Sequence, residues 1–391
     1  MRVHGAFTLV ELMVVMAIMA ILAAAMALAV AGAQEAAQIA KTRSLIARLN
    51  ALVMQKYESY RTRRLPITMP GEVLDPANGP FDMMGNPIPK PTPLKALATI
   101  RCDVIRQLMR MEMPERWTDL DAPALITVAD NSNPAAPITY NDVANPTQPA
   151  VVSMLLPAVT NAYWGQVPEA NQNGVMDFTK VPNAYEGAKC LYLMMTIGMD
   201  DPDIMENFSE GDIGDYDHSG HKVFLDAWGK PIGFLRWAPA FYSPLQPAPN
   251  PFPASPVGGK TYTDGRMPDQ TDPTGIYGHP IVYDNTTGLP QTDKPVTFAL
   301  YPLIYSAGPD GYFDMVSKSG KTFHYVNTSN PRNNPFASLT DTTDFPVPPT
   351  GPGPIGTAAI FDDQGNYLPP GSASRSLGIS DNITNQLIGA R

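Results

Sequence analysis

The apolar and polar positions divide this chain into a uniformly apolar start and a mixed remainder. Leu12–Ala31 is a run of twenty apolar residues without a charge or a polar side chain. As an α-helix it would reach about 30 Å, which is the hydrocarbon thickness of a bilayer. The run therefore predicts a membrane-spanning helix. Glu11 stands directly before it, and a carboxylate within a membrane costs about 2.5–3.5 kcal/mol at the bilayer centre, so Glu11 needs a partner.

Beyond Ala33 the pattern becomes amphipathic. Apolar residues recur every three or four positions as far as Arg64, which places them on one stripe of a helix. No proline occurs before Pro66, so we expect one helix of about fifty residues. Its second half could carry a globular head on the stripe or form a membrane-proximal coiled coil. The stripe consists of Ile39, Thr42, Ile46, Leu49, Val53, Lys56 and Tyr60.

The rest of the chain predicts helices first and strands later. One helix is expected from Thr92 as N-cap to about Met113, before Pro114, and another over Ala184–Ile197, capped by Asn183. This order predicts an α+β head with a small antiparallel sheet. The strand candidates are Lys222–Leu225, Ile232–Trp237, Phe298–Tyr305 and Thr322–Val326, with a hairpin at Ala359–Leu368.

Proline and glycine indicate long loops. The chain has 42 prolines and 30 glycines in 391 residues, more than the average combined share of about 12%. We expect irregular insertions at residues 118–150 and 238–295 and a Pro/Gly-rich extension at residues 337–391. Cys102 and Cys190 are too few for a disulfide scaffold. They form either one bridge or two buried thiols.

The first residues resemble a known family signal. Met1–Ala6 includes Arg2 and His4, and Phe-Thr-Leu-Val-Glu11 then opens the apolar run. This resembles the class III signal of type IV pilins and type II secretion pseudopilins, although those usually have Gly where this chain has Ala6. The alternative is a plain single-span anchor. An ordinary signal peptide fits poorly, because its apolar core is only about 7–15 residues long.

The resemblance implies how the chain is processed. A prepilin peptidase would cut between Ala6 and Phe7 and methylate the new amino group. Glu11, the fifth mature residue, would then pair with that amine on a neighbouring subunit. The implied division is a leader (1–6), a transmembrane and polymerisation helix (7–32), its continuation (33–65), a head with insertions (66–336) and the extension.

A second resemblance lies far downstream. Asp226-Ala-Trp-Gly-Lys-Pro231 resembles the D-x-W-G-x-P signature of the major type II secretion pseudopilin. In that family a strand and a Ser-x-Gly-x-Asp-Gly turn follow, and here Ser306–Gly311 supplies such a turn. The alternative is a chance hairpin with a buried tryptophan. We expect Trp228 to fill an edge of the core, Gly229 to turn the chain and Pro231 to begin the next strand.

Two acidic loops are candidate calcium sites. Asp215, Asp217, Ser219 and Asp226 fit the spacing of a calcium loop, with the His221 carbonyl as a further ligand and Gly220 at the turn. A solvated acidic turn is the alternative. A weaker candidate combines Asp310 with Asp314, and in the resembling family calcium binds at that turn.

The remaining composition argues against other functions. The formal net charge of −10 disfavours a broad phosphate-binding surface, so no nucleic-acid partner is expected, although a local basic patch is compatible with it. The sequence lacks H-E-x-x-H, G-x-S-x-G, P-loop and G-x-G-x-x-G motifs, so we expect no enzyme activity.

The resemblance predicts a structural subunit of a type II secretion pseudopilus. Its partners would be other pilin or pseudopilin subunits, the prepilin peptidase and the assembly platform of a bacterial inner membrane, with the head in the periplasm. The alternatives are a type IV pilin for adhesion, motility or DNA uptake, and a membrane-tethered binding protein that never polymerises.

Overall fold

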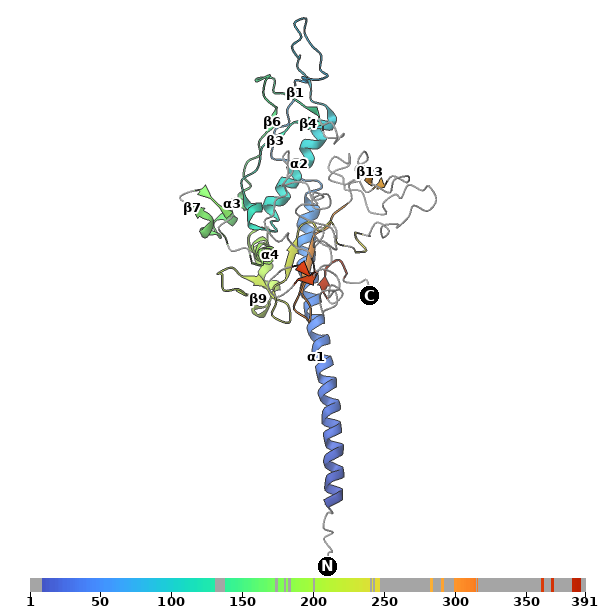
Figure 1. The fold of residues 1–391 in the computed structure, drawn as a ribbon. Helices are drawn as coiled ribbons and strands as arrows, with labels where there is room; N and C mark the ends of the chain where they lie inside the picture. Colours follow the sequence, from blue (N-terminus) through green and yellow to red (C-terminus); the bar gives the residue numbers. More distant parts are fainter. Residues whose placement is uncertain are drawn as a thin grey trace, which may run out of the picture.

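The structure is a computed structural model of the 391-residue chain. It describes residues 9–130, 138–172, 175–178, 181, 184–199, 201–239, 241, 243–246, 299–313, 315 and 382–387, together with four two-residue strands in the segment 282–368. Those strands are β12 (Val282–Tyr283), β13 (Pro290–Gln291), β15 (Ile360–Phe361) and β16 (Tyr367–Leu368). The fold is α+β and pilin-like, with one long amino-terminal helix attached to a head (Figure 1).

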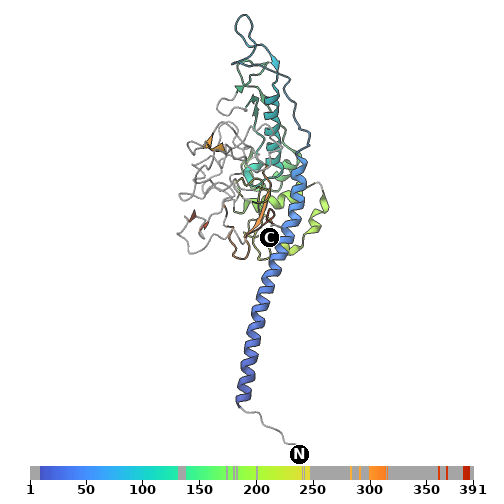
Figure 2. The same cartoon turned by 90° about the vertical axis from the view of Figure 1, so that its right-hand side faces the viewer.

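Helix α1 (Leu9–Ser59) is continuous over 51 residues. Its first half projects from the head as a bare rod, and its second half lies along the head (Figures 1 and 2). The expected apolar stripe is confirmed: Thr42, Leu45, Ile46, Leu49 and Val53 are buried against the head. The head, rather than a coiled-coil partner, therefore covers the stripe. The helix ends at Ser59, a few residues before the expected end.

A three-stranded antiparallel sheet packs against α1. Its order is β11 (Gly233–Leu235), β14 (Leu303–Ser306) and β17 (Ile383–Thr384), with Phe234 opposite Ile304 and Tyr305 opposite Thr384. Asn385 fixes the last strand in place, since its Nδ2 donates to Asn50 Oδ1 on α1 at 2.7 Å. The sequence predicts a Pro/Gly-rich extension here, but residues 382–387 belong to the head.

Helix α4 (Glu186–Ile197) covers β11 and the hairpin of β9 (Ile213–Gly214) with β10 (Val223–Phe224). Leu191 and Met194 of α4 are completely buried in the main core, which they share with Phe224 and Phe234. The chain enters α4 through Tyr185, which adopts a left-handed conformation (φ 56°). The helix therefore begins later than the sequence analysis expected.

The part of the head that lies farthest from the amino terminus is built around α2 (Leu94–Glu112) (Figure 1). Three strand pairs accompany it: β1 (Glu72–Val73) with β2 (Lys90–Pro91), β3 (Ile126–Thr127) with β6 (Val151–Val152), and β4 (Ala129–Asp130) with β5 (Ile138–Thr139). The shorter elements are α3 (Ala158–Trp164), β7 (Asn171–Gln172), β8 (Val175–Met176) and the 3₁₀ turns Trp117–Leu120, Pro168–Ala170, Pro202–Asn207 and Glu210–Asp212.

Several expectations need correction. Residues 118–150 do not form a purely irregular insertion, because Ile126, Val128 and Tyr140 lie in the main core. Helix α2 has Pro93, not Thr92, at its N-cap, and the Thr92 hydroxyl donates instead to the Pro70 carbonyl. The sequence does not predict helix α3, because its seven residues form only about two turns and are too few to show a helical period of apolar positions.

Three of the predicted strands are confirmed at the expected positions, but they are shorter than predicted. The strands at 222–225, 232–237 and 298–305 are each shorter than expected. In the hairpin expected at residues 359–368, β15 and β16 pair antiparallel. The strand expected at Thr322–Val326 lies outside the described residues, as does Asn183. Cys102 and Cys190 are both buried thiols and form no disulfide bridge, which resolves the alternatives left open for them.

Candidate functional site: the anchor helix and the charged loops of the head

The first half of α1 carries the anchoring chemistry. Glu11 lies in the first turn of the helix and is exposed, with apolar side chains on every side of the rod that follows. An 18-residue window of this helix has a mean hydropathy of 2.7, and none of that window is buried inside the head. By length and composition the helix can cross a membrane. The expected cleavage position, Ala6 and Phe7, lies outside the described residues.

The second half of α1 docks directly on the Asp226–Pro231 turn. Thr42 Oγ1 accepts from the Ala227 backbone N–H at 3.1 Å, and Gln38 Nε2 donates to the Ala227 carbonyl at 3.4 Å. Further along, Lys41 Nζ lies 3.0 Å from Asp212 Oδ1. These polar contacts fix the rotation of the rod relative to the head.

The Asp226–Pro231 turn folds as its sequence pattern indicates. Asp226 Oδ1 accepts from the backbone N–H groups of Trp228 and Lys230, both at 2.9 Å. Gly229 has a φ of 76°, which a side chain would strain, and Leu225 bridges Pro231 just before β11. Trp228 is half-buried against the main core, as expected for a residue at its edge.

The two distant motifs of the head meet at one carboxylate. Asp226 Oδ2 accepts from the Ser306 hydroxyl at 2.7 Å, and Ser306 Oγ in turn accepts from the Gly308 N–H at 3.1 Å. Burial of Asp226 raises the pKa of its carboxyl, and these hydrogen bonds oppose the rise only in part. The Asp226 side chain therefore stabilises its own turn and also links it to the Ser306 turn, which lies 80 residues later in the sequence.

The acidic loop at residues 215–226 uses its carboxylates in separate contacts. Asp215 accepts from the N–H groups of Ser219 (3.1 Å) and Gly220 (2.9 Å). Asp217 accepts from the Ser219 hydroxyl and from Lys189 Nζ, both at 2.7 Å. Burial by itself raises the pKa of Asp217, but the hydrogen bonds and the Lys189 charge outweigh it and hold the pKa below its usual range.

Two further residues of this loop make contacts of their own. The His221 ring pairs with Glu169, whereas the ligand expected from His221 is its backbone carbonyl, and Asp226 accepts hydrogen bonds within its own turn and from Ser306. At the weaker candidate, Asp310 Oδ1 accepts from the Tyr312 N–H at 2.8 Å, while Asp314 lies outside the described residues. Within the described residues no group of three or more His, Cys, Asp or Glu side chains could hold a metal ion. The calcium site stays a prediction that these contacts do not strengthen.

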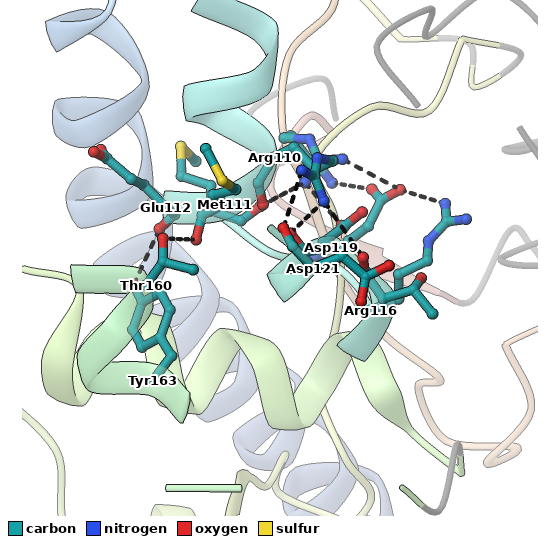
Figure 3. Close-up of polar contacts among 12 residues, drawn as sticks. Arg110, Met111, Glu112, Arg116, Asp119, Asp121, Thr160 and Tyr163 are labelled. Atoms are coloured by element: carbon teal, nitrogen blue, oxygen red, sulfur yellow. Dashed lines mark hydrogen bonds and ion pairs between the residues drawn. The ribbon is translucent and has the colours of Figure 1, made fainter. Parts of the chain in front are cut away.

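A buried ionic cluster that the sequence analysis did not identify joins α2 to the sheet. Arg236, which follows β11, is fully buried and donates from Nη1 to Asp119 Oδ2 at 2.9 Å and to the Met113 carbonyl at 2.8 Å. Its own N–H donates to Glu115 Oε2 at 2.7 Å. Arg110 donates to the carbonyls of Asp119 (2.7 Å) and Asp121 (3.2 Å), as Figure 3 shows.

The charges of this cluster compensate one another. Burial by itself raises the pKa of Asp119, but the guanidinium groups of Arg236, Arg116 and Arg110 outweigh it and lower that pKa below its usual range. Buried ions of this kind are favourable only when their partners are in place. The cluster therefore holds the end of α2, the 3₁₀ turn Trp117–Leu120 and the end of β11 in one arrangement. Sequence alone presents Arg106 and Arg110 as an ordinary charged face of α2.

Glu112 connects the same region to the end of α1. Its carboxylate accepts from the Tyr60 hydroxyl at 2.7 Å and forms an ion pair with Arg63. On the other side, the Tyr163 hydroxyl donates to the Glu112 carbonyl at 3.1 Å, and Figure 3 shows Tyr163 and Thr160 of α3 directed at this end of α2. The head is thus attached to the rod by polar contacts as well as by the apolar stripe.

Comparison with known proteins identifies one segment. A family model described as the prokaryotic N-terminal methylation motif matches residues 1–27. No curated protein and no solved structure matches the chain significantly. The match covers the expected leader, Glu11 and most of the apolar run, and it supports the pilin-like class for this chain. Members of that class are structural subunits.

Proposed function

We infer that this chain is a membrane-anchored structural subunit that is cleaved between Ala6 and Phe7, methylated on Phe7 and assembled with other pilin-like subunits into a fibre. The observation that supports this most strongly is the methylation motif over residues 1–27 together with the bare apolar half of α1. A helix that is apolar on all sides, and that no described residue of the head covers, requires either lipid or other subunits around it.

Glu11 has a defined role in this proposal. Within a bundle of anchor helices, an acid without its counter-charge is heavily penalised, whereas a paired acid fixes the axial position of one helix relative to the next. The new amino group of Phe7 on a neighbouring subunit supplies that counter-charge. Storage in a bacterial inner membrane, with the head in the periplasm, precedes assembly.

Within the class we favour a type II secretion pseudopilus, in which the fibre supports protein export. The supporting observation is the contact between Asp226 and Ser306, since these residues belong to the two turns that resemble the major pseudopilin. A type IV pilin remains the second candidate. A tether that never polymerises is the third, and the large distal part of the head built on α2 would then be a ligand surface.

Substitution of Glu11 separates assembly from tethering. We expect Glu11→Ala to abolish incorporation into fibres while membrane retention and the folded head persist. Glu35→Ala is the matched control, because Glu35 is an exposed acid on the same helix outside the apolar run. Fibres sheared from cells and quantified by immunoblotting would measure the effect. Normal incorporation of Glu11→Ala would contradict the proposal, and unchanged biological activity without any fibre would favour the tether.

A further inference from the structure

The loop that joins β1 to β2 presents apolar side chains at its apex. Met83 is completely exposed and Met84 is 88% exposed, and Phe81 and Ile88 are also exposed on the two arms of the loop. Among the described methionines that follow the apolar run of α1, Met83 and Met84 alone are exposed. Neighbouring apolar side chains that protrude together into solvent are typical of a contact surface.

Hydrogen bonds to Asp82 hold this apex in one shape. Asp82 Oδ1 accepts from the N–H groups of Met84 and Asn86, both at 2.8 Å, and Asp82 Oδ2 accepts from Asn86 Nδ2 at 3.1 Å. Gly85 completes the turn with a φ of 82°. The two methionines therefore stand on a preformed turn, which lowers the cost of ordering it in a contact.

The same turn recurs where the head docks on α1. In Asp226–Pro231 the carboxylate likewise accepts from the N–H groups two and four residues later, and the glycine again has a positive φ. There the second residue, Ala227, contacts α1 through its N–H and its carbonyl, and the third, Trp228, is half-buried. Met83 and Met84 hold these two positions in the exposed turn. One copy of the turn is thus covered by α1, and the other is open.

The open turn and the uncovered half of α1 lie at opposite ends of the molecule. The loop between β1 and β2 lies close to the line of α1 extended beyond the head (Figures 1 and 2). Copies of the chain shifted along that line would bring the turn of one to the rod of the next. A contact between two different patches of identical chains generates an open filament when the operation does not close a ring.

The chemistry of the two surfaces also matches. Leu12–Ala31 offers only apolar side chains, and methionine packs well on irregular apolar surfaces because it is unbranched and adaptable. Residues 80–88 contain no lysine, arginine, tryptophan or tyrosine, which are the residues typical of contacts with a lipid surface. A protein helix therefore suits this turn better than a membrane does.

We propose that the turn Asp82–Pro87 docks with Met83 and Met84 on the apolar half of α1 in a second copy of this chain. The turn would then cover part of the rod that its own head leaves bare. This inference rests on the proposed function, because the contact joins subunits of one fibre.

Photo-cross-linking in fibres of the full-length protein tests the contact. Benzoylphenylalanine replaces Met84 or, as the control, Val175, which is 68% exposed on β8. We expect the position of Met84, but not that of Val175, to give a dimer cross-linked within residues 9–33 of the second copy. Fibres without this dimer, or cross-links to lipid or to a different protein, would overturn the inference and leave the proposed function intact. Absence of fibres from the unmodified chain would overturn both.

A pair of variants measures how much the contact contributes. Met83→Gln combined with Met84→Gln keeps the side-chain lengths but removes apolar surface, so we expect about tenfold less sheared fibre. The melting temperature of the head should not change, since both residues are exposed. Val175→Thr removes apolar surface at the control position and should leave the amount of fibre unchanged. A wild-type amount of fibre from the double variant would overturn the docking of this turn.

Discussion

The two halves of α1 share one backbone geometry but differ in what surrounds them. Leu22, in the first half, is 54% exposed, whereas Leu49, in the second half, is completely buried by the head. Both positions are leucines on a continuous helix, so local propensity does not distinguish them. The difference is that the head packs against the second half only. Among the residues that the structure describes, none covers the first half, so we expect lipid or other subunits to cover it.

The same substitution placed in each half should have opposite consequences, and this is the largest effect we expect. Leu22→Asp puts a charge in the membrane span and should release the protein from membranes without changing the melting temperature of the head. Leu49→Asp buries an unpaired charge and should unfold the head, with a loss of more than about 4 kcal/mol, while the protein stays in the membrane. Membrane fractionation and thermal unfolding measure both. Equal behaviour of the two variants would contradict the comparison.

The buried cluster of the head gives the next largest effect. Arg236→Met leaves the buried carboxylate of Asp119 without its hydrogen-bonded counter-charge, so we expect a loss of about 3–5 kcal/mol in the free energy of unfolding. Arg101→Met is the control, because Arg101 is exposed on α2, and it should change stability by less than about 0.5 kcal/mol. Denaturant unfolding of both variants measures these two changes in the free energy of unfolding. A similar small change in both would show that the cluster does not stabilise the head.

A smaller effect should come from the contact between the two turns. Ser306→Ala removes the hydroxyl that donates to the buried Asp226 carboxylate, so we expect a loss of about 2 kcal/mol. The pKa of Asp226 should rise further, since a hydrogen bond to its charged form is lost. Ser59→Ala is the control, an exposed serine at the end of α1. If its effect on stability equals that of Ser306→Ala, the two turns are not coupled through this bond.

Acid should weaken the head gradually, which is the smallest effect. Burial by itself raises the pKa of the Asp75, Asp119, Asp212 and Asp217 carboxyls, but hydrogen bonds and neighbouring cations outweigh it and hold each pKa below that of an ordinary aspartate. A depressed folded-state pKa contributes stability above the unfolded-state value, and that stability is lost as the pH falls through the folded-state value. The raised pKa of Asp226 acts in the opposite direction. We expect the melting temperature to fall between pH 4 and pH 2, and a constant value over that range would contradict the assigned ion pairs.

The sequence predicts the fold best where an apolar pattern is long or where the residues of a turn are specific to that turn. Fifty residues without proline and a 3–4 spacing predicted α1 and its buried stripe, because helical periodicity is a local property. The Asp226–Pro231 turn was also predictable, since its carboxylate bonds to nearby backbone groups. In each case the information lies within a few residues.

The elements that escaped prediction depend on distant partners. Ile383–Thr384 has too few apolar residues to indicate a strand, and it is one only because β14 lies beside it. Arg236 reads as a surface cation until Asp119, over a hundred residues earlier, is brought to it. The calcium loop stays a prediction from spacing. The hydrogen bond that Asp226 accepts from Ser306 is a long-range contact that the spacing does not include.

The mass and sequence of the mature amino terminus test the central claim most directly. Protein purified from membranes of its natural host should begin at Phe7 and carry one methyl group on the amino nitrogen. That result would identify α1 as a processed assembly helix whose uncovered half is meant for other subunits. A chain that retains Met1, or one that is cut near residue 32 and so loses the apolar run, would contradict the account.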